Sequence, residues 1–339
     1  DVAGTSMFAP SAQTRDDLMA VMNSSVSLEL LAAMAPTLNF EVGTIAELPL
    51  PTSFEGLNPM PMVNNARADW NAFETSWDFT TPPVQGLGSL RQAYKAHYQH
   101  SLETAAEQQR LEEDNNRKVA ELYGLEGEVP IEVPLDRVSL TLNPHFRYGA
   151  GKTGEEYEEL FMRDAAADLI SYAVGSIFGR FSLDKPGFIL MDQGSTLEDF
   201  YEEVPEPSFA PSKTGILPIT AGDWFEDDLS NQVKRFIQTA FGEEHYEENL
   251  TWLEEALGVK QLEDYFPNRF WQDHLQRYKK RPIYWLFSSG RKKDSFNALI
   301  YLHRYTPDTV GEVLNEYVHA LIDKQRVALE SAEQAAEDE

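Results

Sequence analysis

The spacing of apolar and polar residues along the chain predicts a mostly helical protein. In residues 14–36, apolar side chains recur every three or four positions, and Thr14 stands where an N-cap would begin a helix. Residues 88–123 contain no proline, and no glycine after Gly88, which predicts one long helix or a helical hairpin. The second half of that segment is almost wholly polar, so we expect it to project as an arm or a hairpin tip. Further helices are predicted at 155–180, twice within 222–257, each time ending at a glycine, and at 269–279 and 308–330.

Two short segments near the C-terminus have the composition of β-strands. "PIYWLFS" and "FNALIYLHRY" are rich in aromatic and β-branched residues, and "SGRKKDS" between them offers Gly290 for a turn. We therefore predict a short antiparallel hairpin near 283–303 within a helical C-terminal module. The predicted fold class is mainly α with a small β component (α+β). Segments 37–51 and 124–149 are predicted to be extended and punctuated by proline.

A stripe of three aromatic residues lies within the segment 66–79. Trp70, Phe73 and Trp77 are three and four residues apart, which is the spacing of one helix face. A stripe of this kind is usually packed into a core, so we expect a helix whose aromatic face is buried.

The composition excludes several classes of chemistry. The 339 residues include no cysteine, which rules out disulfides, thiolate metal sites and cysteine nucleophiles. No apolar run reaches the roughly 18 residues that span a bilayer, and no signal peptide is recognisable. We therefore expect a cytoplasmic protein with no membrane partner. Asp1 in place of an initiator methionine indicates a piece of a longer protein.

The chain is strongly acidic, with 56 Asp and Glu against 28 Lys and Arg and a formal net charge of −28. Phosphate binding needs clustered cations, so the surface as a whole is unsuited to nucleic acid. Such acidity is most often a solvated surface. Docking of other proteins and mimicry of the DNA backbone are the alternatives.

Motifs that would carry catalysis or bind a metal are incomplete. "GAGKTG" resembles a phosphate-binding loop, but the loop needs a glycine where Phe146 stands. "HYQH" places His97 and His100 three apart on a helix, with no third metal ligand assignable. No Ser–His–Asp arrangement can be identified. The sequence thus predicts no catalytic, cofactor-binding or metal-binding residues.

One stretch reverses the charge of the chain. "RYKKRPIYWLFSSGRKK", residues 277–293, holds seven cations in seventeen positions and no acid. If the middle of the stretch is a strand, the cations mark its two ends, and phosphates of a nucleic-acid backbone are the natural ligand. Alternatively, the cations neutralise the protein's own acidic helices. The candidate DNA-binding residues are Arg277, Lys279, Lys280, Arg281, Arg291, Lys292 and Lys293, with Arg304 on the return strand.

The same stretch carries a resemblance to a known family. "RPIYWLFSSG" followed by "FNALIYLHRYTPDT" resembles the C-terminal region of PglX, the adenine-specific DNA methyltransferase of BREX phage-defence systems. The resemblance continues in order through most of residues 18–325. Its other segments are "NSSVSLELLAAMAPTLNFEVGTIAELPL", "ADWNAFETSWDF", "VPLDRVSLTLNPHFRYG", "ISYAVGSIFGRFSLDKPGF", "GILPITAGDWFEDD" and "FGEEHYEENL".

The resemblance implies a parent enzyme of the restriction-modification kind that serves antiviral defence. Such an enzyme transfers a methyl group from S-adenosylmethionine to the exocyclic amine of adenine. That chemistry requires a glycine-rich cofactor loop and an Asn/Asp-Pro-Pro-Tyr/Phe motif that holds the flipped base. Neither motif is present here, since "NPM" at 58 and "NPH" at 143 lack the second proline and the aromatic residue. We therefore expect a non-catalytic C-terminal part, inactive alone, that leaves S-adenosylmethionine to the rest of the parent enzyme.

The resemblance also implies a division of the chain and a role for it. Residues 1–62 would be the end of the target-recognition region and a connector, 63–126 a helical spacer or arm, and 127–339 a C-terminal helical domain with the basic hairpin. The module would assist DNA binding by the parent protein and dock other BREX components. Two alternatives remain open, a module for protein–protein interaction alone and an acidic DNA mimic.

Overall fold

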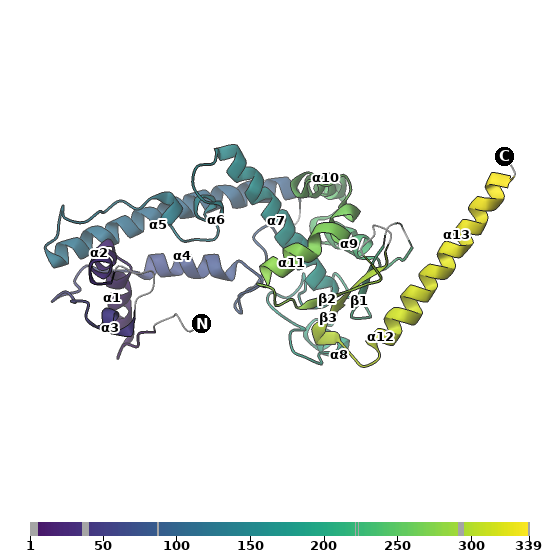
Figure 1. Cartoon of the computed structure of the whole chain (residues 1–339), viewed down its shortest axis with the longest axis horizontal. Helices are drawn as coiled ribbons and strands as arrows, with labels where there is room; N and C mark the ends of the chain where they lie inside the picture. Colours follow the sequence, from purple (N-terminus) through teal and green to yellow (C-terminus); the bar gives the residue numbers. More distant parts are fainter. Residues whose placement is uncertain are drawn as a thin grey trace. The chain divides into compact units, whose positions relative to one another are not determined.

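The computed structural model describes residues 6–35, 41–86, 88–220, 222, 224–290 and 295–337 (Figure 1). The contacts divide the chain into two compact units, Asp1–Trp70 with Tyr98–Tyr157, and Asn71–His97 with Glu158–Glu339. The predicted fold class is confirmed, because the structure is mainly helical with one three-stranded antiparallel sheet among the described residues. The three-part division at 62 and 126 is a division by role in the parent protein, and it stays a prediction.

The first unit is built from helices around a small core. One core cluster in it consists of the buried residues Val21, Val26, Val119 and Ala120. Its elements are α1 (Ala12–Met22), α2 (Ser25–Met34), α3 (Val42–Ala46), α4 (Met60–Asn71), most of α5 (Leu90–Tyr123), the short 3-10 helix η1 (Leu135–Arg137) and α6 (Pro144–Tyr148).

The single helix predicted at 14–36 is wrong, because two serines start separate helices. The hydroxyl of Ser11 accepts a hydrogen bond from the backbone N–H of Thr14 at the start of α1. The hydroxyl of Ser24 does the same for Ser27 at the start of α2. A serine side chain that caps a backbone N–H favours a helix start over continuation of the preceding helix. Thr14 is therefore inside α1 and is not its cap.

The two segments predicted to be extended, 37–51 and 124–149, are only partly so. Residues 37–40 lie outside the described residues, and α3 is helical where an extended chain was expected. The segment 124–149 is irregular, as predicted, but η1 and α6 interrupt it.

The predicted long helix is confirmed as the 34-residue helix α5, but the expected arm is wrong. The amide of Asn115 donates to the carbonyl of Ala20 at 2.9 Å. The side chain of Asn116 accepts from the N–H of Ser25 at 2.9 Å and donates to the carbonyl of Ile131 at 3.1 Å. Because these polar side chains pair with neighbouring backbone, a polar sequence packs inside the first unit.

The aromatic stripe does not form a core. Helix α4 ends at Asn71, and the side chains of Trp70 and Trp77 are 60% and 82% exposed. The buried position on α4 is taken by Asp69, whose carboxylate accepts the backbone N–H groups of Thr141 and Leu142, both at 2.7 Å. The predicted buried aromatic face is therefore wrong. The buried side chain of α4 is a carboxylate, whose two backbone N–H donors satisfy its charge.

The second unit is a sheet packed between helices. Its elements are α7 (Gly154–Ile177), α8 (Leu197–Glu203), β1 (Ile216–Ile219), α9 (Leu229–Phe241), η2 (Glu243–His245), α10 (Tyr246–Leu257), η3 (Leu262–Asp264), the π-helix η4 (Phe266–Phe270), α11 (Trp271–Arg277), β2 (Tyr284–Ser288), β3 (Asn297–Tyr301), η5 (Leu302–Arg304), α12 (Thr309–Glu312), the π-helix η6 (Val313–Val318) and α13 (His319–Glu337). The helices predicted around 155–180, 222–257, 269–279 and 308–330 are confirmed, and glycine follows both α9 and α10 as predicted.

The predicted hairpin is confirmed as β2 and β3, which pair antiparallel with Tyr284 opposite Tyr301. Strand β1 was not predicted. It pairs antiparallel with the other side of β3, so that the strand order is β1-β3-β2. One face of the sheet is covered by Val313 and Tyr317 near the C-terminus. The other face packs on the end of α7, where the ring of Phe178 lies 5.1 Å from that of Tyr284.

Among the described residues, no single helix has the length and apolar character needed to cross a membrane. Helices α1 and α2, bent by 69° at their junction, meet the length and composition test only as a pair.

Candidate nucleic-acid interface

Arg277, the last residue of α11, is used inside the fold. Its guanidinium donates to the carboxylate of Asp168 on α7 and lies 3.6 Å from the carboxylate of Glu74, which also accepts from the hydroxyl of Ser171. The side chain is only 13% exposed. Burial alone would lower the pKa of Arg277, but the two carboxylates raise it. Arg277 thus neutralises acidic side chains of the protein itself, as the second interpretation of the basic stretch expected.

Arg304, at the end of η5, is also committed to the fold. Its guanidinium donates to the carbonyls of Ser212 and Lys213, both at 2.9 Å, and to that of Phe178 at 3.3 Å. Phe178 directly follows α7, so the guanidinium satisfies a carbonyl at the C-terminal end of that helix. Burial lowers the pKa of Arg304 to about 10. With no carboxylate among these contacts, the residue acts as a clamp on backbone carbonyls.

Three candidate residues differ from these two in being exposed. Lys279, Lys280 and Arg281 form what we call the exposed cation cluster, which connects α11 to β2. Within the described part of the chain, their side chains make no hydrogen bond or ion pair. Arg291, Lys292 and Lys293 lie outside the described residues. Of the five candidate residues that the structure describes, two are thus bonded within the fold and three face solvent.

Two lysines of the cluster have an unusual backbone conformation. Lys279 and Lys280 have φ angles of 49° and 63°, in the left-handed region. An L-residue there costs about 1–2 kcal/mol, and glycine is the usual residue at such helix ends. The N–H of Lys280 donates to the carbonyl of Leu275 at 2.7 Å, which holds the turn in place. Both lysines therefore occupy positions at which glycine would be less strained.

Replacement of Lys280 with glycine is expected to raise the free energy of unfolding by up to about 1 kcal/mol, because glycine adopts a positive φ without the steric cost. Chemical denaturation of the variant and the unmodified protein measures this difference. As a control, Lys280→Ala keeps the Cβ atom and should leave stability within about 0.5 kcal/mol. Destabilisation by Lys280→Ala as well as by glycine would show that the lysine side chain itself supports the fold.

Two exposed aromatic residues near the cluster in sequence and on the adjoining strand were not predicted from the sequence. Trp285 on β2 and Tyr305 after η5 are 47% and 39% exposed, and their ring centroids are 6.0 Å apart at an interplanar angle of 59°. Alternation along a strand could have found Trp285, because Tyr284 is buried and its neighbour must point to the opposite face. No sequence signal brings Tyr305 to it, since that contact depends on strand pairing.

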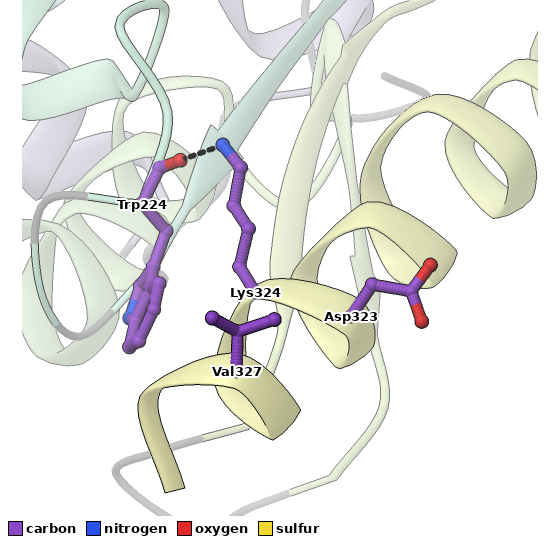
Figure 2. Close-up of a pocket in the computed structure, with 4 residues that line it drawn as sticks. All are labelled: Trp224, Asp323, Lys324 and Val327. Carbon is purple, nitrogen blue, oxygen red and sulfur yellow. Dashed lines mark hydrogen bonds between the residues drawn. The ribbon is translucent and has the colours of Figure 1, made fainter. Parts of the chain in front are cut away.

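A shallow groove beside α13 is a second candidate. Figure 2 shows Trp224, Asp323, Lys324 and Val327 lining it. The ammonium of Lys324 donates to the carbonyl of Trp224 and lies 4.6 Å from the ring centre of Phe225. The cation is thus already paired, and the rest of the wall is mostly apolar, so the groove has no evident acid–base chemistry. In the described part of the chain, no group of three His, Asp or Glu residues is placed to hold a metal ion.

The chain is thus a mainly helical module with three exposed cations beside its sheet. Comparison with known proteins shows which proteins it resembles. No protein-family model matches the chain. The chain is 32% identical over 330 residues to the adenine-specific methyltransferase BrxX of Escherichia coli O9:H4 (strain HS), a match to 93% of this chain and 27% of that protein. It is 33% identical over 347 residues to the adenine-specific methyltransferase PglX of Lacticaseibacillus casei (strain Zhang), covering 95% of this chain and 26% of that protein.

The chain therefore spans about a quarter of the length of the curated relatives it matches. Over that length it is similar to two adenine-specific methyltransferases, BrxX and PglX. The resemblance to PglX seen in the sequence is confirmed.

Proposed function

We propose that this chain is the non-catalytic C-terminal part of an adenine-specific DNA methyltransferase of a BREX phage-defence system. In the parent protein it helps to hold DNA through the exposed cation cluster, while S-adenosylmethionine and the target adenine are bound elsewhere. The observation that carries the DNA role is the cluster itself. Lys279, Lys280 and Arg281 are three adjacent exposed cations that pair with no acidic side chain among the residues the structure describes, in a chain whose net charge is −28. Arg277 and Arg304 are not part of the proposed contacts, since the fold already uses them.

The acidity of the remaining surface supports a local role and not a general one. Contacts to phosphate position a protein on DNA but carry no base information. A small cluster on an acidic module attracts DNA only at short range, because charges are screened beyond about 8 Å at physiological salt. We infer that the cluster works when other parts of the methyltransferase already hold the duplex against it.

An interaction module is the second candidate, and α13 is the observation that favours it. All side chains of residues 322–336 are exposed, and they include the apolar residues Ile322, Val327 and Leu329 (α13, yellow in Figure 1). Contiguous exposed apolar side chains are typical of a docking surface, and Ile322 and Leu329, seven positions apart, share one face of α13. Other BREX components would be the partners, and the cations would then have no part in DNA binding.

Combined replacement of Lys279, Lys280 and Arg281 with alanine in the full-length parent protein tests the DNA role. Affinity should fall by a similar factor for every DNA sequence, because phosphate contacts are independent of sequence. The slope of log affinity against log salt should become shallower by about 0.9 for each phosphate that is no longer neutralised, up to about 3 for the cluster. Binding titrations at several salt concentrations measure both quantities, and thermal melting monitors the fold.

A matched control is available on the same chain. It is the combined alanine replacement of three other exposed cations, which form no ion pair in the described part of the chain: Arg67, Lys95 and Lys260. This variant loses the same total charge as the cluster variant. This control should leave the salt slope unchanged. Equal effects from the two triple variants would refute a specific patch. An unchanged slope in the cluster variant, with a lowered melting temperature, would mean that the cations serve the fold and would favour the interaction module.

A further inference from the structure

The aromatic pair, Trp285 and Tyr305, lies at the edge of the sheet next to the exposed cation cluster. Trp285 is directly opposite Ile300, which is completely buried beneath the C-terminal helices. The side chains of Ile300 and Trp285 lie in one row on the same face of the sheet. Because β2 is an edge strand in the order β1-β3-β2, the indole of Trp285 ends this row and is exposed to solvent. The indole is nearly half exposed, although it has an apolar core beside it.

Tyr305 is held in place by its neighbours. The backbone N–H of Tyr305 donates to the carbonyl of Leu302 at 3.3 Å, and the preceding residue, Arg304, is fixed by its three carbonyl contacts. Trp285 belongs to a strand paired along its whole length with β3. Two aromatic side chains on rigid backbone lose little conformational entropy when they bind a ligand.

The chemistry of this surface combines aromatic faces with cations. Arg281 precedes Trp285 by four residues, at most about 14 Å along an extended chain. Aromatic residues beside clustered cations are the means by which proteins bind unpaired nucleotides, since bases stack on the rings while cations contact the phosphates. In a duplex the base faces are covered by neighbouring base pairs, so an exposed indole has no face to stack on. An acidic protein segment would satisfy the cations but would leave the rings without a partner.

We propose that the aromatic pair and the exposed cation cluster together bind a single-stranded DNA segment, with a base stacked on Trp285. The inference rests on the proposed function for the phosphate contacts, and it adds the class of DNA that is bound. An enzyme that extrudes a base must unpair its substrate locally, and this surface would take up a strand opened in that way.

The test uses the full-length parent protein with two probes, an oligodeoxythymidine of about 12 nucleotides and a duplex of the same length. Trp285→Ala should weaken binding of the single strand about tenfold, with an unchanged salt slope and less than a twofold change for the duplex. Tyr305→Ala should act in the same direction. Trp285→Phe keeps an aromatic face and should retain most of the affinity. Thermal melting of each variant confirms that the fold is intact.

Trp77→Ala is the matched control, since it removes an indole that is 82% exposed and is not part of the site. It should leave both affinities unchanged. The stacking proposal would be overturned if Trp285→Ala left the affinity for the single strand unchanged. It would also be overturned if Trp285→Ala weakened duplex binding equally, or if Trp77→Ala weakened single-strand binding equally. In that case a salt slope still lowered by the cation variants would leave the proposed function standing. Conversely, Trp285→Ala could lower single-strand affinity while the triple alanine variant of the cluster leaves the salt slope unchanged. That result would refute the proposed phosphate contacts but not the stacking on Trp285. Binding of a polyglutamate peptide, but of neither oligonucleotide, would identify a protein partner instead.

Discussion

Replacement of Arg277 with methionine is expected to lower the free energy of unfolding by about 3 kcal/mol. The guanidinium neutralises Glu74, whose side chain is 8% exposed, and pairs with the partly buried Asp168. Removal of one partner leaves a buried carboxylate without compensation, and changes of this type usually cost about 3–5 kcal/mol. The lower end applies because Asp168 retains some solvent. Chemical denaturation of the chain with and without the substitution measures the loss.

The comparison that makes this result interpretable is Arg326→Met. Arg326 pairs with Asp323 on the exposed part of α13, and loss of such a pair should cost less than about 0.5 kcal/mol. A second substitution, Glu74→Gln, should recover part of the stability of Arg277→Met, because the stranded charge is then removed. Full stability of Arg277→Met would contradict a structural role for the arginine and would return it to the set of candidate DNA contacts.

The stability of the second unit is expected to depend on pH through His274. This histidine on α11 is completely buried, and its Nε2 accepts the backbone N–H groups of Ile283 and Tyr284 at 3.2 and 3.4 Å. Burial lowers the pKa of His274 to about 3, and the positive charges of Arg277 and Arg180 act in the same direction. A protonated ring would present a donor to two backbone donors. The fold therefore requires the neutral ring.

The direction of the pH effect follows from the two states. In the unfolded chain, a histidine binds a proton below a pKa of about 6.5, whereas the folded His274 does not until about pH 3. The contribution of this residue is therefore complete above pH 6.5 and is lost as the pH falls from 6.5 toward 3. Between pH 7 and pH 5 the loss amounts to about 2 kcal/mol.

His274→Gln isolates this contribution, because the glutamine carbonyl oxygen can accept the same two N–H groups and does not titrate. The advantage in stability of the unmodified chain over the variant should shrink by about 2 kcal/mol between pH 7 and pH 5. Denaturation curves at several pH values measure the difference, in which the titration of all other groups cancels. His319→Gln, at an exposed position on α13, should show no such narrowing. Parallel pH profiles for His274→Gln and the unmodified chain would contradict the assignment.

The free cations could not be separated from the structural ones in the sequence alone. Arg277 and Lys279 are two positions apart in one basic run, yet one is buried against acids and the other faces solvent. The acid that pairs with Arg277 is Asp168, 109 positions away. A run of like charge shows where cations are concentrated, but it carries no information on which distant acids approach it. Only the packing of α11 on α7 decides this.

Strand β1 was missed for a similar reason. "GILPIT" contains Pro218, and a proline cannot donate to the hydrogen bonds of a central strand. The residue is tolerated because β1 is an edge strand, paired on one side only among the strands that the structure describes. Whether a strand lies at an edge is a property of the assembled sheet and not of its own residues.

The sequence by itself determined the features that depend on neighbouring residues or on whole-chain similarity. The absence of proline and glycine predicted α5, residue pattern predicted α7, α9 and α10, and composition predicted the hairpin of β2 and β3, because helix and strand preferences are local. The ordered resemblance to PglX was also visible in the sequence, and the comparison with known proteins confirmed it. Tertiary structure decided the rest, namely the buried Asp69 in place of an aromatic stripe, the exposure of Trp285 beside Tyr305, and the division of cations between fold and solvent. Each of these depends on contacts between segments distant in sequence, where burial and pairing are set by the partner and not by the residue.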